Sequence, residues 1–249
     1  MIRLPQAATP VLLLTLFCAV MPCGFGARAA DFTSGQRADI VAIVREALKQ
    51  DPSILREAVL ALQADDGQKS QAAARAAIGS AKNTLVKASD PVTGNPQGDV
   101  TIVEFFDTRC PYCRRMEPVM TQFLAQDRRV RLVYKDLPIL GPASVLGSKA
   151  LLAAQQQDAY GKMRDAVMQL PPDTTLPQLE ATARGLGLDW PRMARDMDDP
   201  SLQARLDQNI TLARTLGIQG TPALVIGSDL IPGAVDLPDL KKAVAEARR

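Results

Sequence analysis

Apolar residues recur at intervals of three and four positions along the first part of the chain. They occupy positions 40, 41, 43, 44, 47 and 48, and then positions 54, 55, 58, 59 and 62. This spacing is typical of amphipathic helices, and Asp51-Pro52 between the two stretches predicts a capped helix start. Short amphipathic helices do not bury an apolar side alone. We therefore expect residues 30–88 to be a helical extension that packs on the rest of the chain or, as we favour, associates with other copies.

The pattern changes after residue 88. Pro, Gly, Asn and Asp cluster without periodicity over residues 89–98, which indicates a linker that contains the domain boundary. From residue 99 onward, continuous apolar runs typical of buried strands alternate with helical spacing. Strands are expected at 100–106, 130–134, 223–226 and 230–231, and helices at 111–126, at several places over about 143–216, and from Asp236 to Ala245.

The order of these elements predicts the fold class of residues 99–249. The first strand, the helix and the second strand form a βαβ unit, whose two strands are expected to pair in parallel. The helical insertion follows, and two strands and a helix close the chain as a ββα unit. We therefore expect an α/β fold that carries an N-terminal helical extension.

The first residues have the composition of a signal peptide. Arg3 supplies a positive charge, an apolar run extends from Val11 to Val20, and Ala27-Arg28-Ala29 fits a small-residue cleavage site. The run is too short to span a membrane, which takes about 20 apolar residues. We therefore expect residues 1–29 to be removed and the mature protein to be periplasmic. An uncleaved segment that anchors the chain in a membrane is the alternative.

Charge and composition exclude several classes of function. The chain has 29 basic and 27 acidic residues, and removal of residues 1–29 takes away Arg3 and Arg28, so the mature charge is near zero. This balance gives no support for nucleic acid as a partner. The chain also contains no histidine. Serine–histidine triads, haem ligation by histidine and most transition-metal sites are therefore excluded.

The cysteines carry the clearest chemical signal. Cys110-Pro111-Tyr112-Cys113 directly follows the first expected strand and opens the next expected helix. Two cysteines at this spacing, at a strand-to-helix turn, are typical of thiol–disulfide exchange. The only other cysteines, Cys18 and Cys23, lie in the expected signal peptide. The mature chain then has no structural disulfide framework.

The position of each thiol predicts its role. Cys110 falls at the start of a helix, where free N–H groups and the helix dipole stabilise a thiolate, so it is expected to be the attacking thiol. Cys113 lies one turn further along and is expected to be more buried and to act as the resolving thiol. Arg109, Arg114 and Arg115 could add positive potential, but we interpret each as a solvated charge.

Other uses of the two cysteines are less well supported. A zinc site needs about four ligands, and the mature chain offers no third cysteine and no histidine. We therefore expect no metal and no cofactor. Copper(I) suits thiolates, so a dithiol copper carrier is an alternative. A chaperone module that binds clients through the apolar stripes, with an incidental thiol pair, is another.

Two further positions near the cysteine pair are candidates for the site. Glu104 lies inside an otherwise apolar strand, and a buried carboxylate is costly unless it is paired or used. We interpret it as a proton acceptor and donor for Cys113, with a solvent-facing strand residue as the alternative. Thr221-Pro222 enters the third strand, where a cis peptide bond would leave the neighbouring backbone free to pair with an extended peptide. A trans proline that simply starts a strand is the alternative, and the spacing does not decide between them.

The motifs resemble a known family. Glu104-Phe105-Phe106, Cys110-Pro111-Tyr112-Cys113, Pro118 and Gly220-Thr221-Pro222 resemble the thioredoxin superfamily and, within it, the bacterial periplasmic DsbA-like proteins. The resemblance covers residues 99–249 and implies a thioredoxin-like fold. It also implies that Cys110 is the nucleophile, Cys113 the resolver and Glu104 a buried acid. Pro222 would be the cis-proline that faces the disulfide, and Tyr112, Thr221 and Pro222 would contact the substrate.

The N-terminal helical extension indicates which branch of this family the chain resembles. Phe32 to Arg37, leading to Asp51-Pro52-Ser53-Ile54-Leu55, resembles the ScsC-like, disulfide-isomerase branch, whose members oligomerise through N-terminal segments and are connected to copper tolerance. This implies a homodimer or homotrimer. DsbA itself carries histidine where this chain has Tyr112, and Thr221 is more similar to isomerases than to oxidases. We therefore expect a less oxidising pair than that of DsbA.

The resemblance also implies the reaction and the partners. It implies exchange with unfolded or misfolded secreted proteins, with isomerase or reductase activity favoured over net oxidation. A DsbA-like net oxidase is the alternative. A membrane redox partner that restores the active oxidation state is also expected.

Overall fold

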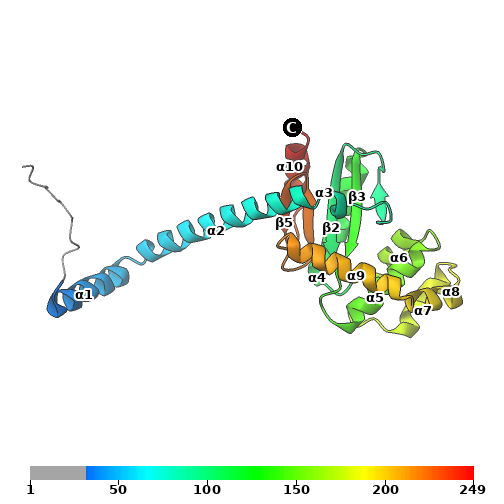
Figure 1. Cartoon of the computed structure of the whole chain (residues 1–249), viewed down its shortest axis with the longest axis horizontal. Coiled ribbons are helices and arrows are strands. Elements are labelled where there is room, and N and C mark those ends of the chain that lie inside the picture. The colour runs from blue at the N-terminus through cyan, green and yellow to red at the C-terminus, as the bar shows by residue number, and fades with distance from the viewer. Residues whose placement is uncertain (1–31) are drawn as a thin grey trace, which may run out of the picture. The chain divides into compact units, whose positions relative to one another are not determined.

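The computed structural model describes residues 32–249, and the expected signal peptide lies outside these residues. The chain divides into two compact units, with the division between Val59 and Leu60. Figure 1 labels the helices and strands. None of the helices within residues 32–249 has both the length and the apolar character that membrane crossing requires.

Helix α1 (Ser34–Gln50) begins with a reciprocal pair of hydrogen bonds. Gln36 N–H donates to the side-chain oxygen of Thr33 at 3.3 Å, and Thr33 N–H donates to Gln36 Oε1 at 2.9 Å. This capping box satisfies donors that the first turn would otherwise leave free. The helix ends at Gln50, and the carboxylate of the C-cap residue Asp51 accepts a hydrogen bond of 3.0 Å from Ser53 N–H at the start of α2 (Ser53–Ser80). The break between the helices therefore falls at Asp51-Pro52, as the sequence predicts.

The apolar side chains of these helices have two different environments. None of the residues of α1 is buried. Near the end of α2, by contrast, Ala74 and Ile78 belong to a buried cluster that includes Val103 and Phe105. The exposed apolar side chains of α1 and of the first part of α2 are Ile40, Val41, Ile43, Val44, Ile54, Leu55, Val59, Leu60 and Leu62.

A five-stranded mixed sheet forms the centre of the unit Leu60–Arg249. The strand order is β1-β3-β2-β4-β5, in which β2 and β3 are parallel and the other neighbours are antiparallel. The parallel pair confirms the βαβ unit, since α4 (Pro111–Gln126) connects its strands. The strands are β1 (Val92–Gly94), β2 (Val100–Phe106), β3 (Val130–Asp136), β4 (Ala223–Ile226) and β5 (Asp229–Pro232).

The remaining helices cover the sheet and form the insertion. Within the described residues, five helices stand between β3 and β4, which confirms the expected helical insertion. Helices α5 to α8 gather at the lower end of the strands in the view of Figure 1. The helices are α3 (Lys82–Leu85), α5 (Pro142–Gln155), α6 (Tyr160–Val167), α7 (Leu176–Gly185), α8 (Trp190–Met197), α9 (Pro200–Thr215) and α10 (Leu237–Ala247).

Each face of the sheet carries its own apolar cluster. Successive strand residues point to opposite faces, and the clusters follow this alternation. Ile102 and Phe106 of β2 pack with α4 and the insertion, whereas Val103 and Phe105 pack with the end of α2 and with α9. Glu104 has the same parity as Ile102 and Phe106. Its side chain therefore points to the face that α4 and the insertion cover.

The segment 89–98 is part of the folded unit, which differs from the linker that the sequence predicts. Tyr134 N–H donates to Pro91 O at 3.0 Å, and β1 pairs with β3 just beyond. Asp90 forms a buried ion pair with Lys135 at 2.6 Å, with side chains 2% and 1% exposed. The turn-forming residues of this segment predict a linker because β1 forms only by pairing with β3, about 40 residues further along the chain. The division between the two units instead falls within α2.

Candidate active site

Cys110 is the N-cap residue of α4, and Pro111 lies in the first turn. The backbone of Cys110 is extended, and its N–H donates to Asp107 O at 3.1 Å. The free N–H groups and partial positive charge of a helix N-terminus stabilise an anion at this position. Cys110 is 4% exposed, so its sulfur lies close beneath the surface.

The surroundings of Cys110 favour its thiolate. Its pKa is lowered to about 5, chiefly because the Cys113 thiol donates a hydrogen bond to the Cys110 sulfur. Burial opposes this shift, while the Thr221 side chain and the N–H groups of Cys113 and Tyr112 add to it. The Thr221 carbonyl oxygen lies 3.1 Å from Cys110 Sγ and accepts a hydrogen bond from the thiol, so it favours the protonated form. The donors outnumber this acceptor, and Cys110 is therefore a thiolate at neutral pH.

Cys113 has the opposite character. Its side chain is fully buried. Its pKa is raised well above the ordinary value because it donates its proton to the Cys110 sulfur and because it is desolvated. The negative charge of Glu104 raises the pKa of Cys113 further. One sulfur is thus ready to attack, while the other holds its proton until a base removes it.

Glu104 is a buried carboxylate on the face of the sheet that α4 covers. It is completely buried, and neither of its carboxylate oxygens has a hydrogen-bond partner within the described residues. Burial raises the pKa of Glu104 to about 7, while the charge of Arg164 lowers it and that of Glu117 raises it. A carboxyl group with this pKa exchanges its proton at neutral pH. Glu104 therefore does not face solvent, which is the alternative interpretation of its position in the strand.

Thr221 and Pro222 lie beside Cys110 although 111 positions separate Thr221 from it in the chain. The peptide bond between Thr221 and Pro222 is cis. β4 begins directly after this bond and pairs with β2. Pairing with the strand that leads to Cys110 therefore brings the Thr221 carbonyl to the cysteine.

Exposed apolar side chains lie near Cys110. Tyr112 is 53% exposed, and the Arg115 guanidinium lies 4.3 Å from the centre of its ring. Ile139 and Leu140 are also exposed. They belong to the segment whose N–H groups bond to Asp107, three residues before Cys110. The loops around Cys110 therefore carry an exposed apolar surface.

Asp107 is a structural part of the site that the sequence patterns do not single out. Its Oδ1 accepts a hydrogen bond of 2.8 Å from Arg109 N–H. Its Oδ2 accepts hydrogen bonds of 2.9 Å and 3.0 Å from the N–H groups of Ile139 and Leu140. Asp107 thereby joins the two loops that follow the parallel strands β2 and β3. The only sequence signal for this role is an aspartate directly after a buried strand.

Arg109 and Arg114, on either side of the α4 N-terminus, bind backbone carbonyls, which differs from the solvated charges that the sequence predicts. Arg109 donates to Leu140 O and Pro172 O and pairs with Asp173. Arg114 donates to Thr108 O and Leu170 O. These contacts tie the loop around Cys110 to the segment between α6 and α7. The contacts with residues 170–173 depend on tertiary packing that no local pattern encodes.

Arg164 is a second residue that the sequence patterns do not reveal. It belongs to α6, is 2% exposed, and its Nη2 lies 3.8 Å from Glu104 Oε2. Nothing in the local pattern of α6 distinguishes this arginine from a surface arginine. The available signal is indirect, because a carboxylate inside an apolar strand requires a cationic or hydrogen-bonding partner somewhere in the fold.

The part of the chain that the structure describes, residues 32–249, contains no group of three or more cysteine, histidine, aspartate or glutamate side chains placed to hold a metal ion. Cys110 and Cys113 are free thiols in this structure. The chemistry of the site therefore follows from the two sulfurs, Glu104 and the Thr221 carbonyl.

Two family models match the chain. The DsbA-like thioredoxin domain matches residues 101–245, and the N-terminal domain of the copper resistance protein ScsC matches residues 36–69. The first match contains the whole sheet except β1 and the first residue of β2. The second lies on α1 and the first part of α2.

Solved structures agree with both matches. A thioredoxin-like oxidoreductase from Silicibacter pomeroyi is 42% identical, covers 65% of this chain and 94% of its own, and has a TM-score of 0.63. ScsC from Proteus mirabilis, in a transitional conformation, is 31% identical, covers 88% of this chain and 98% of its own, and has a TM-score of 0.64. The ScsC match thus extends over both units of the chain.

Curated relatives add one further comparison. The Na(+)/H(+) antiporter NhaA 3 of Salinispora tropica is 29% identical over 160 residues, which are 64% of this chain and 24% of that protein. The chain spans about a quarter of the length of the antiporters that it matches. The family model 101–245 covers more than half of the chain, and the ScsC similarity includes the helical extension. The chain therefore belongs to the DsbA-like family of thioredoxin domains, with an ScsC-type N-terminal domain.

Proposed function

We propose that this chain is a thiol–disulfide oxidoreductase that exchanges disulfides with polypeptide clients through Cys110 and Cys113. The contrast between the two thiols carries the proposal, since the pKa of Cys110 is lowered to about 5 while that of buried Cys113 is raised. Such a contrast suits a nucleophile followed by a resolving thiol. The family membership supports the same chemistry.

The reaction proceeds through a mixed disulfide. The Cys110 thiolate attacks one sulfur of a client disulfide, forms an S–S bond with it and releases the other client sulfur as a thiolate. Glu104 then accepts the proton of Cys113, and the Cys113 thiolate attacks Cys110 Sγ. This step forms the Cys110–Cys113 disulfide and releases the reduced client. In isomerisation, a client thiolate attacks the mixed disulfide instead and releases Cys110 as a thiolate.

Isomerase or reductase activity is favoured by two observations. Attack on a wrong disulfide needs reduced Cys110, and the stabilised thiolate keeps it reactive at neutral pH. The exposed apolar side chains of α1 and the start of α2 are suited to association with other copies. A homodimer or homotrimer would display several active sites to one misfolded client.

Net oxidation is the second candidate, and the low pKa of Cys110 supports it. Stabilising the reduced form makes a disulfide a stronger oxidant, and a thiol whose pKa is lowered to about 5 is stabilised as the thiolate at pH 7. The two activities differ in the redox state that the cell maintains. An unidentified membrane redox partner would set that state.

The proposed setting is the periplasm. The signal-peptide composition of residues 1–29 and the similarity to ScsC support this location. The clients would be unfolded or misfolded secreted proteins, for which the exposed side chains of Tyr112, Ile139 and Leu140 offer an apolar contact surface.

Repair of scrambled ribonuclease tests the proposal. We expect the reduced protein to restore ribonuclease activity, Cys110→Ser to abolish this, and Cys113→Ser to accumulate mixed disulfides with the client. Oxidation of reduced ribonuclease, without repair of the scrambled form, would make net oxidation the correct candidate. Equal repair by wild type and Cys110→Ser would contradict both.

A further inference from the structure

Arg164 brings a positive charge from the helical insertion to the buried face of the sheet. Its Nη1 donates a hydrogen bond of 2.6 Å to Glu117 Oε2, and its Nη2 donates to Glu117 Oε1. The same Nη2 lies 3.8 Å from Glu104 Oε2. One guanidinium is therefore shared between a carboxylate of α4 and the buried carboxylate of β2.

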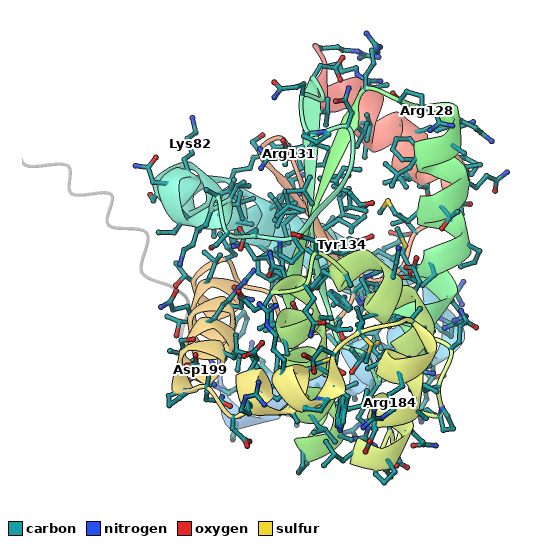
Figure 2. All side chains as sticks on the ribbon, turned by 90° about the vertical axis from the view of Figure 1, so that its right-hand side faces the viewer. Lys82, Arg128, Arg131, Tyr134, Arg184 and Asp199 are labelled. Carbon is teal, nitrogen blue, oxygen red and sulfur yellow. The ribbon has the colours of Figure 1, made fainter. Side chains whose placement is uncertain are left out.

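Aromatic rings fix the plane of this guanidinium. Its central carbon lies 4.0 Å from the centre of the Tyr134 ring and 4.8 Å from that of the Phe106 ring. Tyr134, labelled in Figure 2, lies near the middle of that view. Packing on two rings, together with the paired bonds to Glu117, holds Arg164 at a set distance from Glu104.

The geometry differs from that of an ordinary buried ion pair. A distance of 3.8 Å exceeds that of a hydrogen bond, and both oxygens of Glu104 have no hydrogen-bond partner within residues 32–249. A structural pair would use these oxygens, since an unsatisfied buried charge is costly. The positive charge of Arg164 instead favours the ionised form of Glu104, while the carboxylate oxygens remain available to accept a proton.

On its other side, buried Arg164 adjoins a cleft. Arg164, Glu117 and Tyr134 line a cleft of about 690 Å³ that the loop after β1 borders. The Glu117 side chain is 16% exposed, whereas that of Glu104 is completely buried. The Arg164–Glu117 pair thus stands between the buried carboxylate and the solvent.

We propose that Arg164 is a positioning residue for proton transfer between Cys113 and Glu104, with Glu117 holding it in place. The proposal rests on the exchange reaction proposed above. In the resolving step the Cys113 S–H bond breaks and its proton forms an O–H bond with Glu104. Arg164 keeps Glu104 ionised before this step, and the resulting Cys113 thiolate then attacks Cys110 Sγ.

The charges around Glu104 determine the direction of the expected effects. Burial and the charge of Glu117 raise its pKa, and the charge of Arg164 lowers it. Removal of the cation therefore raises the pKa of Glu104, whereas removal of the Glu117 charge lowers it. The other titratable groups around this cluster are Cys113 of α4, which Cys110 at the N-cap contacts, Tyr134 and Asp136 of β3, and Tyr160 and Asp165 of α6.

The test measures the release of glutathione from a Cys110–glutathione mixed disulfide as a function of pH. We expect Arg164→Gln to shift the midpoint of this Cys113-dependent step upward by about one to three pH units. We expect Glu117→Gln to shift it downward, because the amide oxygen still accepts a hydrogen bond from Arg164 while the negative charge is lost. Arg164→Lys, which keeps the charge, should retain most of the wild-type midpoint. Opposite shifts distinguish an electrostatic role from a structural one, because loosened packing would change both variants in the same direction.

A second readout and a control complete the experiment. The ¹³C resonance of the Glu104 carboxyl group in the oxidised protein should show the same two shifts without any exchange reaction. Arg184→Gln is the matched control, because Arg184 lies at the periphery of the view in Figure 2 and pairs only with Glu180 within the described residues, in an exposed i,i+4 contact, so neither midpoint should move.

Three outcomes separate the claims. If Arg164→Gln does not fold, Glu117→Gln and Arg164→Lys still decide the question. An unchanged midpoint in Arg164→Gln, an unchanged or raised midpoint in Glu117→Gln, or a strongly shifted midpoint in Arg164→Lys, with wild-type exchange intact, overturns the role of Arg164 alone. Failure of the wild-type Cys113 to release glutathione at any pH overturns the proposed function itself.

Discussion

The sulfur of Cys110 lies 3.1 Å from the carbonyl oxygen of Thr221, and the Thr221 side chain also contributes to lowering the pKa of that sulfur. One residue before the cis-proline that leads into β4 thus contacts the nucleophile through two groups with opposite effects. The carbonyl oxygen holds a thiol, whereas the hydroxyl group stabilises a thiolate. A substitution at Thr221 therefore changes the pKa of Cys110 without altering Cys110 itself.

The lowered pKa of Cys110 predicts the pH dependence of its alkylation. Because its pKa is about 5, the alkylation rate should reach half of its plateau near pH 5, compared with about 8.5 for an unperturbed thiol. Iodoacetamide labelling of the reduced Cys113→Ala variant isolates Cys110 chemically. This variant also removes the largest hydrogen-bond donor, so its midpoint should lie above that of the wild type. An ordinary thiol midpoint in the wild type would contradict the assignment of Cys110 as the nucleophile.

Thr221→Val tests the hydroxyl contribution. Valine has the shape of threonine but donates no hydrogen bond, and a hydrogen bond to a charged group contributes about 1.5–3 kcal/mol. The alkylation midpoint of Cys110 should therefore rise by about one pH unit or more. Thr221→Ser keeps the donor and serves as the matched control. If the alkylation profiles of Thr221→Val and the wild type coincide, the hydroxyl group does not lower the pKa of Cys110.

Glu104 predicts how the stability of the oxidised protein varies with pH. Its pKa in the folded state is raised from 4.5 to about 7, so the folded chain binds its proton more tightly than the unfolded chain. The contribution of Glu104 to stability is then fully present below pH 4.5 and is lost as the pH rises through 7. Glu104→Gln does not titrate at this position. The free energy of unfolding of Glu104→Gln, measured relative to that of the wild type, should therefore increase by about 3 kcal/mol as the pH rises from about 4 to about 8.

Urea unfolding of the oxidised proteins at several pH values measures this difference. Oxidised protein is required because the titration of Cys110 would otherwise add to the result. Asp136, whose pKa burial raises to about 6, titrates in both proteins and cancels. Parallel stability curves for wild type and Glu104→Gln would show that Glu104 has an ordinary pKa.

Local patterns are sufficient for the parts of the site that adjoin the cysteine pair in sequence. The apolar run Val100–Phe106 with Glu104 inside it indicates a buried strand with a buried acid, and Cys110 at the following turn indicates a helix N-cap. Both features depend on a few neighbouring residues and on backbone geometry that is common to strands and helices. The pattern does not indicate that Glu104 shares a cation with Glu117.

Tertiary contacts explain what the sequence does not predict. Arg164 reaches Glu104 from 60 positions away, and β1 is recognised only by its pairing with β3. Val92–Gly94 is too short to show a strand period and lies among turn-forming residues. Such features become visible only once the sheet order is known.

The exposed apolar side chains of α1 predict self-association of the mature protein. Ile43 is 68% exposed in the single chain. Burial of such a side chain in an interface contributes about 1.5–3 kcal/mol, so Ile43→Glu should weaken association by about tenfold or more. Arg45→Glu, on the same helix, is the matched control for the added charge. Light scattering across a concentration series should show the wild type and Arg45→Glu as oligomers and Ile43→Glu as a smaller species.

The same variants connect assembly to function. Because the cysteine pair lies in the other compact unit, Ile43→Glu should keep the wild-type alkylation profile of Cys110. Repair of scrambled ribonuclease should fall with the loss of association if several active sites must act on one client. Full repair by a monomeric Ile43→Glu variant would show that a single active site suffices, and a monomeric wild-type protein would contradict self-association itself.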